Sequence, residues 1–285
     1  MFIHSVYKHG RENNPLLIDK VMRMYSRFQL LKKYIQYCIY ASNRKGHGIH
    51  SPFVFEFIKN VLNDKKDYAV YKKIEDRRKI LLRDASVIDV EDFGAGNSTS
   101  SKRQINKIAA SSLKSKKYAR LLYRMVKYYQ PKNVVELGTS FGITTSYLAA
   151  GSSVHVYTLE GASSIASVAQ QNFLHLNIKN IELIQGPFDL TLPGLLSSIS
   201  DPGLVFIDGN HRKHATLDYF LQFVNHSTSS TILIFDDIHW SREMEEAWEI
   251  IKKNPVVTLT LDLFFIGIVL LRKEFKVKQH FLIRF

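Results

Sequence analysis

Cysteine and long hydrophobic runs are scarce in this chain of 285 residues, and each scarcity excludes a class of protein. The single cysteine, Cys38, excludes a disulfide-stapled secreted scaffold and favours a reducing compartment. The longest apolar stretch, 256–271, is interrupted by Thr258, Thr260 and Asp262. It is also shorter than the roughly 18 apolar residues of a membrane-spanning helix. Because no signal-peptide pattern opens the chain, we expect a cytoplasmic protein.

Acidic residues are also scarce, but only in the first part of the chain. Residues 1–130 hold 27 Lys and Arg against 11 Asp and Glu, whereas residues 131–285 hold 12 against 15. We therefore separate a basic N-terminal lobe, residues 1–117, from a second domain, residues 118–285. Such asymmetry suggests contact with RNA, another polyanion, a membrane surface or an acidic substrate. The alternative is that dispersed lysines only keep the helices of the lobe solvated.

The N-terminal lobe has mainly helical patterns. Apolar residues spaced by three and four predict an amphipathic helix from about Leu17 to Tyr40, which would pack on the second domain or lie on a membrane surface. Ser51-Pro52 is a helix-start signal. Further helices are expected at 68–82, in the lysine-rich stretch 98–117, and at 118–129. Two loops are also predicted, one with His47 and His50 as candidate phosphate or metal contacts, and one with Gly94 and Gly96.

From residue 131 onward, strand and helix patterns alternate. Apolar, β-branched runs lie at 134–137, 154–159, 181–185, 204–207 and 231–235, with helix-like segments between them. This alternation predicts a mostly parallel α/β sheet, whose functional residues follow the carboxyl ends of the strands. The runs at 256–261 and 264–271 would supply a final pair of strands.

The first of these strands contains Glu136 and leads into a glycine-spaced loop, Gly138-Thr139-Ser140-Phe141-Gly142. Glycine allows a tight turn and a close approach of the backbone to a nucleotide. The Gly-x-x-x-Gly spacing differs from the Gly-x-Gly-x-x-Gly of dinucleotide enzymes. We therefore assign Glu136, Gly138, Thr139, Ser140 and Gly142 to binding of S-adenosylmethionine (SAM).

The second and third strands supply further candidates for cofactor binding. Glu160-Gly161 ends the second strand about 20 residues after the glycine loop, where an acidic residue binds a ribose diol. Phe188 follows the third strand, at the position where the family resemblance given next implies that the adenine would lie.

Four motifs in this order carry a resemblance to a known family: Glu136-Leu137-Gly138-Thr139-Ser140-x-Gly142, Thr158-Leu159-Glu160-Gly161, Phe206-Ile207-Asp208-Gly209-Asn210-His211, and Ile234-Phe235-Asp236-Asp237-Ile238. Residues 131–272 resemble a class I SAM-dependent methyltransferase, of the catechol O-methyltransferase-like branch and its bacterial relatives. The resemblance implies a Rossmann-like, seven-stranded, mostly parallel sheet with its last strand antiparallel. The helical patterns of residues 1–117 add an N-terminal, mainly helical lobe to this sheet.

Three carboxylates should converge where the fourth and fifth strands end: Asp208, Asp236 and Asp237. They would repel one another unless a cation or protons offset their charge, and Mg²⁺ or Mn²⁺ suits such oxygen ligands. The matching positions of catechol-type enzymes bind a metal, so the resemblance implies a metal site on these three residues. Capping of the next helix is the other reading of Asp236-Asp237.

The expected reaction is transfer of a methyl group to a hydroxyl of a small molecule. Asp208, His211 and Asp236 would be catalytic, with Asp208 also contacting the cofactor. His211 stands where the family has a lysine base, and a histidine can accept a proton near neutral pH. His239-Trp240 could line the acceptor pocket.

Two other functions stay open at this point. The basic lobe could track the phosphates of an RNA, most simply a tRNA. The domain could also bind SAM or a partner without catalysis. The sequence specifies neither the acceptor nor the oligomeric state.

Overall fold

The computed structural model describes residues 24–42, 51–92 and 99–285. The two loops noted above, with His47 and His50 and with Gly94 and Gly96, lie outside the described residues. So does the first part of the helix expected from Leu17.

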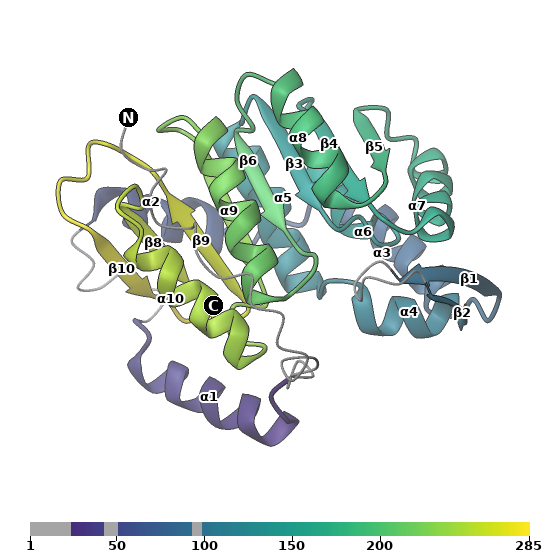
Figure 1. Ribbon diagram of the computed structural model, residues 1–285, viewed down its shortest axis with the longest axis horizontal. Helices are drawn as coiled ribbons and strands as arrows, with labels where there is room; N and C mark the ends of the chain where they lie inside the picture. Colours follow the sequence, from purple (N-terminus) through teal and green to yellow (C-terminus); the bar gives the residue numbers. More distant parts are fainter. Residues whose placement is uncertain (1–23, 43–50, 93–98) are drawn as a thin grey trace, which may run out of the picture.

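A single eight-stranded sheet forms the centre of the protein, in the order β10-β8-β9-β7-β6-β3-β4-β5 (Figure 1). Its strands are β3 (Asn133–Leu137), β4 (His155–Glu160), β5 (Ile181–Gln185), β6 (Leu204–Ile207), β7 (Ile232–Asp236), β8 (Leu259–Asp262), β9 (Ile266–Leu270) and β10 (Gln279–Leu282). All pairings among β3 to β7 are parallel, and β9 is antiparallel to both β7 and β8. The α/β sheet and the antiparallel final strand of the expected seven are confirmed.

The eighth strand, β10, was not predicted. It pairs in parallel with β8 at the edge of the sheet, and its four residues alternate between half-buried and exposed positions. A short, half-exposed edge strand carries a weak sequence signal, because only one face of it is apolar.

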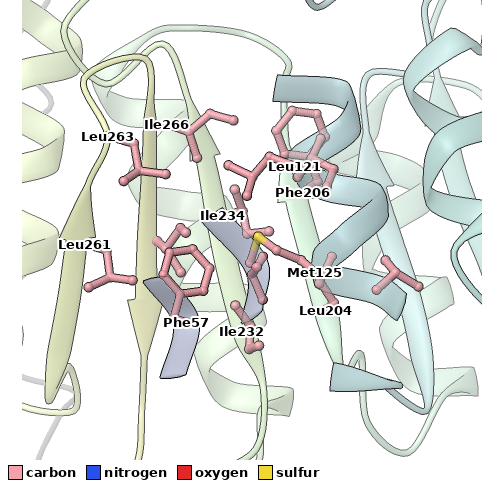
Figure 2. Close-up of a cluster of buried hydrophobic side chains, with 14 of the residues drawn as sticks. Phe57, Leu121, Met125, Leu204, Phe206, Ile232, Ile234, Leu261, Leu263 and Ile266 are labelled. Atoms are coloured by element: carbon pink, nitrogen blue, oxygen red, sulfur yellow. The ribbon is translucent and has the colours of Figure 1, made fainter. Parts of the chain in front are cut away.

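Helices cover both faces of the sheet. One face packs against α5 (Lys116–Tyr129), α2 (Pro52–Phe57) and its π-helical continuation η2 (Ile58–Leu62). In Figure 2, Leu121 and Met125 of α5 and Phe57 of α2 lie over side chains of β6, β7 and β8. The other face packs against α8 (Phe188–Ser198), α9 (Lys213–His226) and α10 (Arg242–Lys253). The central strands β6, β7 and β9 are buried and apolar on both sides.

A third apolar cluster joins helices from the first half of the chain to residues that follow β3 and β4. It combines residues of α3 (Ala69–Leu81) and α5 with the start of α6 (Ile143–Ala150) and the connection before α7 (Ser163–Leu176). A buried ion pair between Glu75 and Arg78 lies beside it, and the Tyr147 hydroxyl donates to Glu75. Residues before and after position 117 therefore share one apolar core.

The stretch expected to be helical from residue 98 is helical only in part. Strands β1 (Val87–Asp92) and β2 (Thr99–Gln104) form an antiparallel hairpin, and α4 (Ile105–Ser112) follows it. The polar composition of β2 hid the strand, because strand prediction relies on apolar alternation. In Figure 1 the hairpin and α4 lie beneath α6 and α7.

Helix α1 (Arg27–Tyr40) starts later than expected. Ser26 and Gln29 form a reciprocal capping box, which sets the helix start at Arg27. The helix packs through Tyr34 and Tyr37 on Phe264, whereas Phe28, Leu31, Ile35 and Ile39 face outward, 52–77% exposed. The expected packing of its apolar residues on the second domain is thus wrong for most of them. No helix in the described part of the chain is long and apolar enough to cross a membrane.

Candidate active site

The carboxyl ends of β3, β4, β6 and β7 surround a cavity of about 690 Å³. A volume of this size is typical of small-molecule and cofactor sites. Sheet ends supply one side of its lining: Gly138, Ser140, Glu160, Phe188, Asp208, Gly209, Asn210, His211, Asp236 and Asp237. The opposite side comes from β2, α4, the connection 113–115 and α5, with Trp240 and Phe265 completing the wall.

Three non-glycine residues of this lining, all within three residues of a strand end, have left-handed backbone conformations. They are Ser140 (φ 49°), Asn210 (φ 50°) and Asp237 (φ 53°). Such conformations are uncommon outside glycine, and they concentrate at functional sites, where the surrounding structure enforces them. These conformations turn the chain sharply near the ends of β3, β6 and β7. As a result, side chains from three loops line the same cavity.

The glycine loop lies directly against the end of β6. A Cβ on Gly138 (φ +97°) would be 2.2 Å from the Asp208 carbonyl oxygen, so only glycine fits there. The Ser140 amide donates a hydrogen bond of 2.9 Å to the Glu160 carboxylate. The glycine loop therefore contacts both the end of β6 and Glu160 at the end of β4.

Glu160 faces the cavity with its carboxylate held by backbone amides. Its second oxygen accepts from the Ala162 amide at 3.1 Å. Burial raises the pKa of Glu160, and these backbone hydrogen bonds oppose that rise. A carboxylate fixed in this way can still accept hydrogen bonds from a diol, as the sequence predicted for a ribose.

Four of the predicted cofactor residues do not line the cavity: Glu136, Thr139, Gly142 and Gly161. Glu136 is fully buried and accepts from the hydroxyls of Thr145 and Thr158. Burial raises the pKa of its carboxyl to about 8. Glu136 therefore links β3 to α6 and β4 through hydrogen bonds and does not reach the cavity. The predicted cofactor residues that line the cavity are Gly138, Ser140, Glu160, Phe188 and Asp208.

Phe188 lies where an adenine was expected, at the start of α8. A Cβ on Gly209 would be 2.6 Å from its ring, so the ring packs directly on the backbone after β6. The Phe188 ring also meets Tyr219 edge to face, with centroids 6.0 Å apart. This packing fixes one apolar wall of the cavity.

The acidic end of the cavity is built from β6 and β7. Asp208, His211 and Asp236 each direct one ligand atom to a common point, with these atoms within 4.8 Å of one another. His211 Nε2 lies 3.6 Å from Asp208 Oδ1. Asp237 lines the cavity but is not part of this group, and burial raises the pKa of its carboxyl. The predicted catalytic residues are thus brought together.

Lys114, which the sequence analysis missed, lies inside this cluster. Its Nζ contacts Asp236 Oδ2 and is 3.8 Å from Asp208 Oδ2. A divalent cation on these two carboxylates would lie against the ammonium group, so the arrangement does not fit a resident metal. Residues 107–117 contain four lysines, and no sequence pattern distinguishes Lys114 from the other three.

His239, which follows this cluster in the chain, has another role than expected. His239 does not line the cavity but bridges Glu245 and Asp262, at 3.0 and 2.8 Å. Helix α10 is capped by Ser241, which accepts from the Met244 amide, so the reading of Asp236 and Asp237 as its caps is wrong. Trp240 does line the cavity.

The cavity wall opposite the sheet comes from a segment in which no site residue was predicted. Arg103, Ser112 and Tyr118 line it, and the hydroxyls of Ser112 and Ser140 are 2.9 Å apart. That contact links α4 directly to the glycine loop.

Comparison with known proteins supports this reading of the fold. Residues 135–238 match a family model described as a methyltransferase domain. No curated protein sequence matches the chain. Among solved structures, a methyltransferase from Podospora anserina with bound SAH is 11% identical, with a TM-score of 0.56, covering 78% of this chain and 97% of that one.

Two further structures are similar. An O-methyltransferase from Bacillus cereus in complex with SAH is 19% identical, with a TM-score of 0.52 over 76% of this chain and 97% of that one. A putative O-methyltransferase from Klebsiella pneumoniae is 17% identical, with a TM-score of 0.53 over 73% and 92%. At these identities the likenesses show the fold. Residues 135–238, where the family model matches, are therefore similar to a methyltransferase domain.

Proposed function

We propose that this protein transfers a methyl group from SAM to a hydroxyl oxygen of a small molecule. The observation that carries the proposal is that one cavity contains both Glu160, with its fixed carboxylate, and the pair Asp208–His211. The first suits the ribose of a nucleoside cofactor, and the second suits removal of a proton from an acceptor. Two of the similar structures contain SAH, the demethylated form of SAM.

When bound, SAM supplies an electrophilic methyl group on a positively charged sulfur. The chain must hold the acceptor oxygen in line with this methyl group and take its proton. His211 Nε2 accepts that proton, and Asp208 stabilises the resulting imidazolium. The oxygen–carbon bond forms as the carbon–sulfur bond breaks, and the bonding electrons stay on sulfur. The products are a methyl ether, SAH and one proton on His211.

The volume of the cavity, about 690 Å³ for cofactor and acceptor together, favours a small acceptor over a polymer. Part of residues 1–117 would act as a cap on a methyltransferase domain of residues 118–285, since Arg103 and the segment 111–115 line the cavity. Tyr118, Trp240 and Phe265 supply aromatic walls on the acceptor side. A reducing, cytoplasmic location agrees with the single free cysteine.

Replacing Glu160 by glutamine tests the cofactor part of this proposal. Charge-assisted hydrogen bonds contribute about 1.5–3 kcal/mol, so SAH affinity should fall roughly 10- to 100-fold. Isothermal titration calorimetry with SAH measures the change. The matched control is Glu182→Gln, since Glu182 lies on the edge strand β5 and its side chain is 57% exposed. If Glu160→Gln binds SAH as the unmodified protein does, Glu160 does not hold the ribose.

A further inference from the structure

The ammonium group of Lys114 lies at the centre of the acidic cluster. The Asp236 side chain that it contacts is fully buried, and the Lys114 side chain is 13% exposed. Its second neighbour, Asp208, is 16% exposed. A buried aspartate needs a partner for its charge, and Lys114 is that partner for Asp236.

The fold fixes Lys114 in this place. The connection between α4 and α5 has only three residues, 113–115, so both ends of it are held by helices. Ser112, just before the connection, is linked to the glycine loop through Ser140. The adjacent lysines point elsewhere, because Lys116 pairs with Glu75 at 3.4 Å and Lys117 lies over the Phe285 ring. Lys114 alone of these three faces the cavity.

The same carboxylates are the ones that could hold a metal. Asp208, His211 and Asp236 could each give one ligand atom to a single ion. Such an ion would need the space between Asp208 and Asp236 where the ammonium now lies, and the two cations would repel each other. The site can hold the lysine or the metal, and in this structure it holds the lysine.

We propose that Lys114 supplies the positive charge that a divalent metal would otherwise supply between Asp208 and Asp236, so that the enzyme works without a metal. An ammonium group has three N–H donors. With Asp236 and Asp208 on one side, a remaining donor can point into the cavity and hydrogen-bond the acceptor oxygen. Lys114 then stabilises the negative charge that develops on this oxygen while His211 takes the proton. This role rests on the proposed function, because it assumes a hydroxyl acceptor.

Titration calorimetry with Mn²⁺ alone tests directly whether Lys114 occupies the place of a divalent metal. We expect no stoichiometric binding to the unmodified protein at submillimolar Mn²⁺. Lys114→Gln, which keeps a hydrogen-bond donor for Asp236, should gain one Mn²⁺ site. Adding Asp236→Asn to it should abolish the gain, and Lys114→Arg should bind no metal.

Two results would overturn the proposal. One is a stoichiometric Mn²⁺ site in the unmodified protein that Asp236→Asn removes. The other is a Lys114→Gln protein that binds SAH normally but still binds no Mn²⁺, since the carboxylates would then not form a site freed by removal of the lysine. SAH binding is measured on every variant, so loss of folding is recognised separately. Absence of SAH binding in the unmodified protein would contradict the proposed function instead.

Kinetics give a second readout once an acceptor is known. A chelator such as EDTA should leave the rate of the unmodified enzyme within twofold. Lys114→Gln should lower kcat at least 50-fold while KM for SAM changes less than threefold, and Lys114→Arg should recover part of kcat. A rate that collapses with EDTA and returns with Mg²⁺ would show that the metal, not Lys114, supplies the charge.

Discussion

The side chains after β6 and β7 determine what chemistry the cavity can support. Asp208, His211 and Asp236 come from two neighbouring strands, and their functional atoms meet because parallel strands end at the same edge of the sheet. The sequence contained enough information to place them together. It did not contain the position of Lys114, because the side-chain direction in the connection 113–115 depends on the packing of α4 and α5.

Loss of the proposed base is the sharpest test at this scale. His211→Gln should lower kcat roughly 10²- to 10⁴-fold, the usual contribution of a general base. Binding of SAH should change little, because Glu160 and the glycine loop are untouched. The matched control is His214→Gln, since His214 is 92% exposed and lies outside the main cavity. Equal rates for His211→Gln and the unmodified enzyme would exclude His211 as the base.

At the scale of elements, the central sheet was more predictable than its edges. Strands β3 to β7 are short apolar, β-branched runs followed by polar loop residues, a pattern that is typical of parallel strands. β2 and β10 could not be predicted, because they are polar or half-exposed and gain their order from pairing with a neighbouring strand. Helix α1 was found, but its docked face was not, since aromatic residues rather than the aliphatic stripe make its contacts.

Helix α1 is attached to the domain through an ionic cluster around Glu245 of α10. Lys33 and the Tyr25 hydroxyl contact this carboxylate, at 2.9 and 2.7 Å, and His239 joins it to Asp262. Burial alone would lower the pKa of His239, but its hydrogen bonds to Asp262 and Glu245 raise it to about 9. Burial would raise the pKa of Glu245, whereas His239, Tyr25 and Lys33 lower it to about 2.

The raised pKa of His239 predicts a pH-dependent contribution to stability. Because this pKa is about 9 in the folded protein against 6.5 ordinarily, the contribution is complete below pH 6.5 and is lost as the pH rises through 9. The free energy of unfolding of the unmodified protein should exceed that of His239→Gln by a margin that shrinks about 3 kcal/mol over this range.

Urea unfolding at pH 6 and pH 10 measures that margin. His226→Gln, a change at an exposed histidine of α9, is the control and should keep a constant margin. A margin for His239→Gln that is equal at both pH values would mean that His239 is not charged in the folded protein.

At the scale of the whole molecule, several lysines of the basic N-terminal part form ion pairs in the described residues. Lys72 and Lys79 pair with Asp76, Lys33 pairs with Glu245, and Lys116 pairs with Glu75. These ion pairs lie within helices or between them. The lysines that form them are less available to bind the phosphates of an RNA. The lobe also contributes Arg103 and Lys114 to the cavity, so its basic character reaches the site itself.

The most direct test of the account is methyl transfer from methyl-labelled SAM to a deproteinised cell extract, separated into RNA and low-mass fractions. Magnesium is present throughout, so that the outcome does not depend on the role of Lys114. We predict label in the low-mass fraction, resistant to RNase and lost with His211→Gln but not with His214→Gln. Label in the RNA fraction that RNase releases, or no label in either fraction, would contradict the proposed methylation of a small hydroxylated acceptor.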